Sequence, residues 1–116
     1  MKQNDMMSDP FQALSDPTRR NILVLLKKER LTVNQLASNF DISRPAVSKH
    51  IKLLHRAGFL RIESLGRERF CVLDNKGFDR LDDWLEFFDD FWKNKFQSLQ
   101  SLLDNRSDHR NKKGKV

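Results

Sequence analysis

The segment SRPAVSKHIKLLHRAG, from Ser43 to Gly58, decides the fold because it predicts a single helix with both ends marked. Ser43 suits the N-cap, where its hydroxyl accepts a hydrogen bond from a first-turn amide that has no intrahelical partner. Pro45 is tolerated in that turn because the amide it lacks is not needed there. Gly58 suits the left-handed position just beyond the last turn. The pattern therefore predicts a helix bounded by Ser43 and Gly58.

The two sides of this predicted helix differ in chemistry. Val47, Ile51 and Leu54 recur at helical spacing and form an apolar stripe. The segment contains four lysines and arginines and no acid, and its polar side carries Arg44, Ser48, Lys49, Lys52 and Arg56. Such a helix is a candidate for the DNA major groove. From the helix alone, a solvated basic face is an equally good interpretation.

A second helix is predicted immediately before it. Thr32 opens the run TVNQLASNF, and Gln35, three residues later, completes a capping box. This helix ends at Asp41 and Ile42, and Ser43 begins the next one at once. Two helices joined by so short a turn predict a helix-turn-helix, in which the second helix reads the groove.

Two earlier helix starts share one device, an aspartate followed by a proline. Asp9-Pro10 predicts a short helical turn, with Phe11 and Leu14 as its apolar residues, and Asp16-Pro17 predicts a helix to about Lys28. The residues expected to be buried on the longer helix are Ile22, Leu23, Leu25 and Leu26. Arg19 and Arg20 lie near its start, an end unfavourable for cations. A phosphate, an acidic partner or simple exposure are the alternatives for them.

The pattern changes to strand after Gly58. Residues 59–63 and 68–73 are rich in β-forming residues and flank Gly66, which predicts a hairpin with Arg67 and Arg69 at or near its tip. A basic hairpin directly after a helix-turn-helix is typical of a wing that reaches phosphate or the minor groove. Two choices of the buried face of the second strand remain, one with Phe70 and Val72 and the other with Cys71 and Leu73.

Residues 74–77 form a cluster that predicts a turn, and residues 78–103 predict one long helix or two with a bend. The apolar positions of this stretch exceed what a small domain needs to cover its own core, which indicates an interface. Its six acids against three bases indicate that it points away from DNA. We expect residues 1–9 to be disordered, and residues 104–116 to form a disordered basic tail that adds weak, salt-sensitive DNA affinity.

Composition restricts the class of protein. A chain of 116 residues is expected to form one domain, and its net charge of +6 favours an anionic partner, nucleic acid before membrane. A single cysteine excludes an intramolecular disulfide framework and suits a reducing cytoplasm. We find no secretory signal, no apolar run of membrane-spanning length, no Gly-rich phosphate loop and no nucleophile elbow, so an enzyme is not expected.

With these elements in order, the chain resembles the ArsR family of bacterial winged-helix repressors. The resemblance is carried by ALSDPTRRNILVLL and by the longer run LTVNQLASNFDISRPAVSKHIKLLHRAGFLRIESLGRERFCVL, and with the last helix it covers roughly residues 10–103. It implies a mainly α fold with a small β-hairpin, a winged helix-turn-helix, and a homodimer through the terminal helices. The residues expected at the dimer interface are Phe11, Leu14, Leu85, Phe88, Phe91, Trp92, Phe96 and Leu99.

The best-known members of this family sense metals, and the ligands they use are missing here. One of their sites uses cysteines on the first helix of the helix-turn-helix, where this chain has QLAS from Gln35 to Ser38. Another uses Asp and His pairs on the last helix, which here contains no histidine. The resemblance is therefore to the non-metal branch, with no cofactor expected. Cys71 senses oxidants only if it is exposed and its pKa is depressed.

The function predicted is a sequence-specific, double-stranded DNA-binding transcriptional regulator, a repressor of an imperfect palindrome. Arg44, Ser48, Lys49 and His50 are expected to meet base edges or nearby phosphates. Thr32, Asn34, Ser43 and Lys52 are expected to position the DNA backbone, and Arg67 and Arg69 to hold the wing. The alternatives are a metal- or ligand-gated sensor on the same scaffold and a winged-helix module that binds another protein.

Overall fold

In the computed structural model, residues 8–110 are described, with side chains through Asp104. The elements are α1 (Pro10–Ala13), α2 (Pro17–Lys28), β1 (Leu31–Thr32), α3 (Val33–Ala37), α4 (Arg44–Arg56), β2 (Leu60–Leu65), β3 (Glu68–Leu73), α5 (Asn75–Glu86) and α6 (Asp89–Arg110). The chain divides into two compact units, with the boundary between Asp82 and Asp83, and each unit is described by itself. Mainly helical structure with a small antiparallel sheet confirms the predicted fold class.

The helix starts in the first unit follow the capping chemistry of the sequence. The carboxylate of Asp9 accepts from the Phe11 amide, and that of Asp16 accepts from the amides of Thr18 and Arg19. The capping box of Thr32 and Gln35 is present in both directions. The short α1 and the longer α2 therefore begin where the two Asp-Pro pairs predict them.

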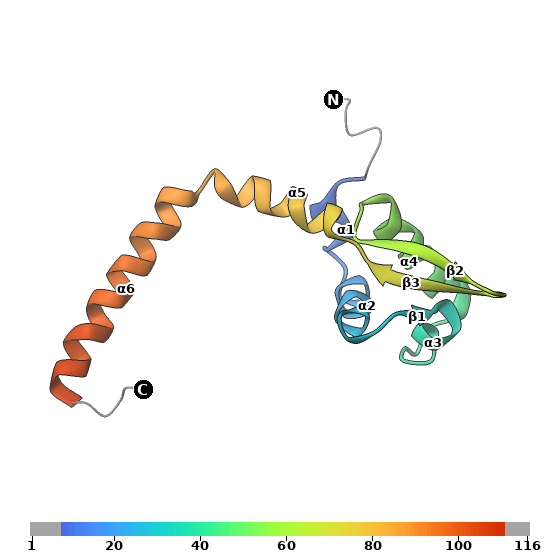
Figure 1. The fold of residues 1–116 in the computed structure, drawn as a ribbon, viewed down its shortest axis with the longest axis horizontal. Coiled ribbons are helices and arrows are strands. Elements are labelled where there is room, and N and C mark those ends of the chain that lie inside the picture. The colour runs from blue at the N-terminus through green and yellow to red at the C-terminus, as the bar shows by residue number, and fades with distance from the viewer. Residues whose placement is uncertain (1–7, 111–116) are drawn as a thin grey trace. The chain divides into compact units, whose positions relative to one another are not determined.

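The sheet has the strand order β1-β3-β2 and is antiparallel throughout. Leu60 pairs with Leu73 and Leu65 with Glu68, so that β2 and β3 form the predicted hairpin. Figure 1 shows this ribbon extending away from the helices with its turn at the far end. The third strand, β1, was not predicted: its two residues pair with Cys71 and Phe70 of β3.

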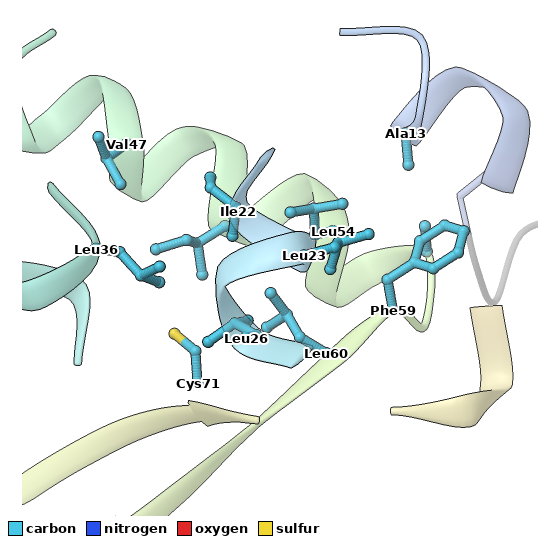
Figure 2. Close-up of a cluster of buried hydrophobic side chains, with 12 residues drawn as sticks. Ala13, Ile22, Leu23, Leu26, Leu36, Val47, Leu54, Phe59, Leu60 and Cys71 are labelled. Atoms are coloured by element: carbon cyan, nitrogen blue, oxygen red, sulfur yellow. The ribbon is translucent and has the colours of Figure 1, made fainter. Parts of the chain in front are cut away.

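The core of the first unit lies between the sheet and helices α2, α3 and α4. Its buried members are Ala13, Ile22, Leu23, Leu26, Leu36, Val47, Ile51, Leu54, Ala57, Phe59, Leu60 and Cys71 (Figure 2). Leu25, predicted to be buried, is only partly so and packs against this cluster. Because Cys71 is fully buried and Leu73 packs on the cluster, the inward face of β3 is the one with Cys71 and Leu73.

The prediction of a turn over residues 74–77 is wrong, because Asn75 to Gly77 form the first turn of α5. Asp74 accepts from the Lys76 amide and so caps the new helix. The Gly77 amide donates to the carbonyl of Gly58 at 2.7 Å, and the Asp74 amide to that of Phe59 at 2.9 Å. Glycine is needed at position 77 because the backbone there lies close to the ring of Phe59: a Cβ would lie 2.6 Å from Cδ1 of that ring.

The remaining boundaries also differ in detail from the expected ones. Helix α3 ends at Ala37, although the predicted helix extended to Phe40. Of the two alternatives for residues 78–103, the structure has two helices, interrupted at Phe87 and Phe88, which lie in a turn. Helix α6 continues through Arg110 and so includes the first residues of the expected tail, while residues 111–116 lie outside the described part.

Candidate nucleic-acid interface

The helix α4 forms as its ends predict. The hydroxyl of Ser43 accepts from the Ala46 amide at 3.2 Å, and Pro45 lies in the first turn. At the other end, the amide of Gly58 donates to the carbonyl of His55 and that of Phe59 to the carbonyl of Leu54. This pair of bonds, with Gly58 at φ 87°, is the Schellman ending that glycine favours.

The apolar stripe fixes which side of α4 faces outwards. Val47, Ile51 and Leu54 are buried against the core, so that the basic side is left at the surface. On that side Arg44, Ser48 and Lys52 recur every four residues and share one face of the helix. Ser48 is half-buried, whereas Arg44 and Lys52 are exposed.

Helix α3 contacts this face through one side-chain pair. The Nε of Arg44 donates to Oδ1 of Asn34, which joins the two helices of the helix-turn-helix across their turn. Since Nε is occupied, the two terminal nitrogens of the guanidinium remain available for a bidentate contact.

An open groove of about 680 Å³ lies between the helix-turn-helix and the hairpin. The predicted DNA-binding residues that line it are Thr32, Asn34, Arg44, Ser48, Lys52, Arg67 and Arg69. Gly66 and Arg67 form a two-residue turn between the strands, and the positive φ of 61° at Gly66 suits this tight turn. Arg67 therefore lies in the turn itself and Arg69 lies close to it on β3. The structure thus brings together residues from α3, α4 and the β2–β3 hairpin on one concave, basic surface.

Three predicted DNA-binding residues do not line this groove. Ser43 uses its hydroxyl to cap α4, and Lys49 is exposed elsewhere on the helix. His50 is half-buried, and its Nδ1 lies 3.1 Å from a terminal nitrogen of Arg19 on α2.

Three acidic or basic residues that were not predicted to bind DNA also line the groove. His55, Arg56 and Glu68 belong to its walls. Helical spacing was a usable signal for two of them, since His55 and Arg56 follow Lys52 by three and four residues. Glu68 lies opposite Leu65 at the hairpin end, and its charge opposes the arginines beside it.

Arg19 and Arg20 have a structural use that the sequence did not reveal. Arg19 donates from Nε to the carbonyl of Ala13 at 2.7 Å, and Arg20 donates to the carbonyl of Leu14 at 2.7 Å. Both side chains therefore satisfy carbonyls at the end of α1, which a helix C-terminus leaves unpaired. Asp16 lies beside them: burial raises the pKa of its carboxyl, but hydrogen bonds from the amides of Thr18 and Arg19 and the nearby guanidinium of Arg19 lower that pKa overall.

Cys71 lacks the two properties of a redox-sensing thiol, which are exposure and a lowered pKa. It is fully buried in β3, and burial raises the pKa of its thiol to about 11 against the opposing effect of Arg69. Within the described part of the chain, no group of three or more His, Cys, Asp and Glu side chains is arranged to hold a metal ion. In the same part, no helix has the length and apolar character needed to cross a membrane.

The second unit carries an exposed apolar surface, which we call the aromatic face. Its members are Trp84, Leu85, Phe87, Phe88, Phe91, Trp92, Phe96, Leu99, Leu102 and Leu103. The six residues of this stretch that were predicted at the dimer interface are all exposed: Leu85, Phe88, Phe91, Trp92, Phe96 and Leu99. In the first unit Phe11 is exposed too, whereas Leu14 packs partly against the core.

A helix-turn-helix followed by a basic hairpin, with a groove between them, defines a winged-helix DNA-binding protein. A sequence model of the bacterial regulatory proteins of the arsR family matches residues 16–61. The transcriptional repressor SdpR of Bacillus subtilis is 47% identical over 79 residues, which cover 68% of this chain and 88% of that protein. The regulator Rv2034 of Mycobacterium tuberculosis is 37% identical over 98 residues, or 84% of this chain and 89% of the relative.

Solved structures agree with these relatives. The crystal structure of an ArsR-family transcriptional regulator, RHA00566, is 38% identical with a TM-score of 0.65, and the match covers 72% of this chain and 92% of that one. The chain belongs to the ArsR family and is a DNA-binding transcriptional regulator. The predicted resemblance is thereby confirmed.

Proposed function

We propose that the protein is a repressor that binds an imperfect palindromic operator as a homodimer. The observation that carries the proposal is the groove, in which Arg44, Ser48 and Lys52 on one face of α4 lie between α3 and the hairpin arginines. The relatives named as repressors support the same direction of regulation. Blocking polymerase at an overlapping promoter is the simplest mechanism for such a protein.

We infer different roles for the residues that line the groove. Arg44 presents two free guanidinium nitrogens, the geometry that reads O6 and N7 of guanine. Lys52 and Arg56 lie further along the same helix and suit phosphates, as do Arg67 and Arg69 on the wing. Thr32 is committed to its capping box through Oγ1 and contributes to the wall beside the groove.

The aromatic face supports the proposed homodimer. An apolar surface of this extent is unusual on a soluble monomer and is typical of an interface. A second copy supplies an identical face, and a two-fold dimer buries both. Two half-site contacts are then linked, which converts weak binding at each into strong binding of the pair. We propose that this dimer acts in the bacterial cytoplasm, on the nucleoid.

A footprint on the DNA upstream of its own gene tests this proposal. We expect protection of two half-sites whose centres lie about one helical turn, 10 to 10.5 base pairs, apart. Insertion of about five base pairs between them places the half-sites on opposite faces of the duplex, and should abolish binding. Insertion of a full turn should restore part of it. Protection of a single site that ignores the spacing would contradict the dimeric repressor.

A further inference from the structure

The side chain of Arg19 joins two elements that belong to different parts of the proposed mechanism. Its Nε donates to the carbonyl of Ala13 at 2.7 Å, and one terminal nitrogen to the carbonyl of Gln12 at 3.3 Å. Its other terminal nitrogen lies 3.1 Å from Nδ1 of His50. One planar group therefore contacts the end of α1 and the middle of α4 at the same time.

The chemistry of arginine decides the state of the histidine. A guanidinium has five donors and no acceptor, so Nδ1 of His50 must be the acceptor and carries no proton. The neutral ring then holds its proton on Nε2. The charged groups beside His50 are Arg19 on α2 and Asp16 at the N-cap of that helix. Helix α3 carries no ionisable side chain, and the charged side chains of β2, Arg61 and Glu63, pair with each other.

We propose that Arg19 is a positioning residue for the recognition helix, and that His50 is its acceptor and not a base-reading residue. The proposal rests on the proposed function and deepens it. His50 is half-buried and does not line the groove, whereas an arginine that ties α1 to α4 fixes where Arg44 and Ser48 stand. Since Phe11 of α1 is exposed and is a proposed dimer contact, the same link connects the dimer surface with the DNA-reading surface.

Arg20 provides a matched control. It follows Arg19 on α2, carries the same charge, and also donates to the end of α1, at the carbonyl of Leu14. The structure gives it no bond to α4. Arg20→Ala therefore removes the same charge and the same kind of α1 bond without touching the proposed link.

The first test uses the free protein and requires no DNA. Long-range ¹H–¹⁵N correlation of the histidine rings reports which nitrogen carries the proton, at about pH 8.5, above the titration range of an ordinary imidazole. We expect His50 to be in the Nε2–H form in the wild type and in Arg20→Ala, and a mixed population in Arg19→Ala. An Nδ1–H ring in the wild type, or a ring that ignores Arg19→Ala, would overturn the link.

The second test measures affinity for the footprinted operator by fluorescence anisotropy. Arg19→Ala and His50→Ala should each weaken binding about tenfold, and the double variant should be no weaker than either, because both remove one coupling. His50→Asn keeps an acceptor near the position of Nδ1, and should bind within about twofold of wild type. If His50 instead touches DNA, His50→Asn falls as far as His50→Ala while Arg19→Ala does not, and the proposal is wrong.

Thermal unfolding of each variant separates lost positioning from lost folding. His50→Asn and His50→Ala change the same half-buried residue and leave Arg19 in place, so that their comparison holds even if Arg19→Ala unfolds. Failure of the wild type to prefer its operator would overturn the proposed function and the DNA role of the link. The ring tautomer would still decide whether the link itself exists.

Discussion

Nε of Arg44 donates to Oδ1 of Asn34, and this bond aims the guanidinium of the recognition helix into the groove beside the wing. Arg44→Ala should therefore cost roughly 1 to 3 kcal/mol of operator binding if the side chain reads a guanine. Arg44→Lys should recover little, because an ammonium lacks the planar fork. Titration against operator variants at the contacted base pair checks this: the alanine variant should lose the preference for guanine there.

Lys52 supplies the contrast within the same helix. If it contacts phosphate, Lys52→Ala should weaken binding to operator and random DNA alike and lower the slope of log affinity against log salt by about one. Arg44→Ala should change the ratio of the two affinities far more than the slope. Wild-type behaviour in both variants would mean that the recognition helix is misassigned.

The aromatic face yields a prediction about assembly. Phe96 is 65% exposed in the single chain, so that Phe96→Asp leaves the core of the first unit intact while it introduces a charge into the proposed interface. Analytical ultracentrifugation should show a monomer, and operator affinity should fall by about a hundredfold or more as the linked half-sites separate. Asn94→Asp adds the same charge to an exposed position of α6 outside the aromatic face, and should remain dimeric. A dimeric Phe96→Asp would place the interface elsewhere.

Gly77 yields a prediction about stability. Alanine is a better helix former by about 1 kcal/mol, but a Cβ at this position lies 2.6 Å from the ring of Phe59, which the core holds in place. We expect Gly77→Ala to lower the free energy of unfolding by about 1 to 2 kcal/mol, because overpacking exceeds the gain in propensity. Asp79→Ala, at an exposed position of the same helix, is the control for thermal melts. A more stable Gly77→Ala would show that Phe59 moves aside at little cost.

Cys71 yields a prediction about reactivity. The pKa of its thiol is raised to about 11 by burial, so that little thiolate forms near neutral pH. A disulfide reagent should label the folded protein slowly at about pH 8 and rapidly once denaturant unfolds it. The stabilisation from burying the neutral thiol is complete below about pH 9 and is lost as the pH rises through the folded pKa of about 11. Rapid labelling of the folded protein would reopen a redox role.

Local chemistry explains which parts of the fold were predictable. Ser43 and Gly58 act on their own helix, and the capping box of Thr32 and Gln35 spans three residues, so that the sequence alone locates these boundaries. The turn predicted at residues 74–77 was wrong because a glycine before a helical pattern favours a turn. The residue that requires Gly77 in the helix, Phe59, is distant from it in the sequence.

The same distinction applies to the site. Spacing along α4 identifies Arg44, Ser48 and Lys52 together, because residues four apart share a face. It did not show that His50 turns towards α2, since its partner Arg19 precedes it by 31 residues. Strand β1 was missed for a similar reason: its two residues are a strand only because β3 lies beside them.

The most direct test of the account is a fluorescence-anisotropy titration of the purified protein against its upstream promoter DNA, over a salt series, with random DNA alongside. A chelator and added zinc are included as further arms. We predict salt-dependent binding that favours the promoter by about a thousandfold or more and ignores both chelator and zinc. Equal, weak binding to the two DNAs would contradict the conclusion that the protein recognises a specific operator. The basic charge alone would then explain its affinity for DNA.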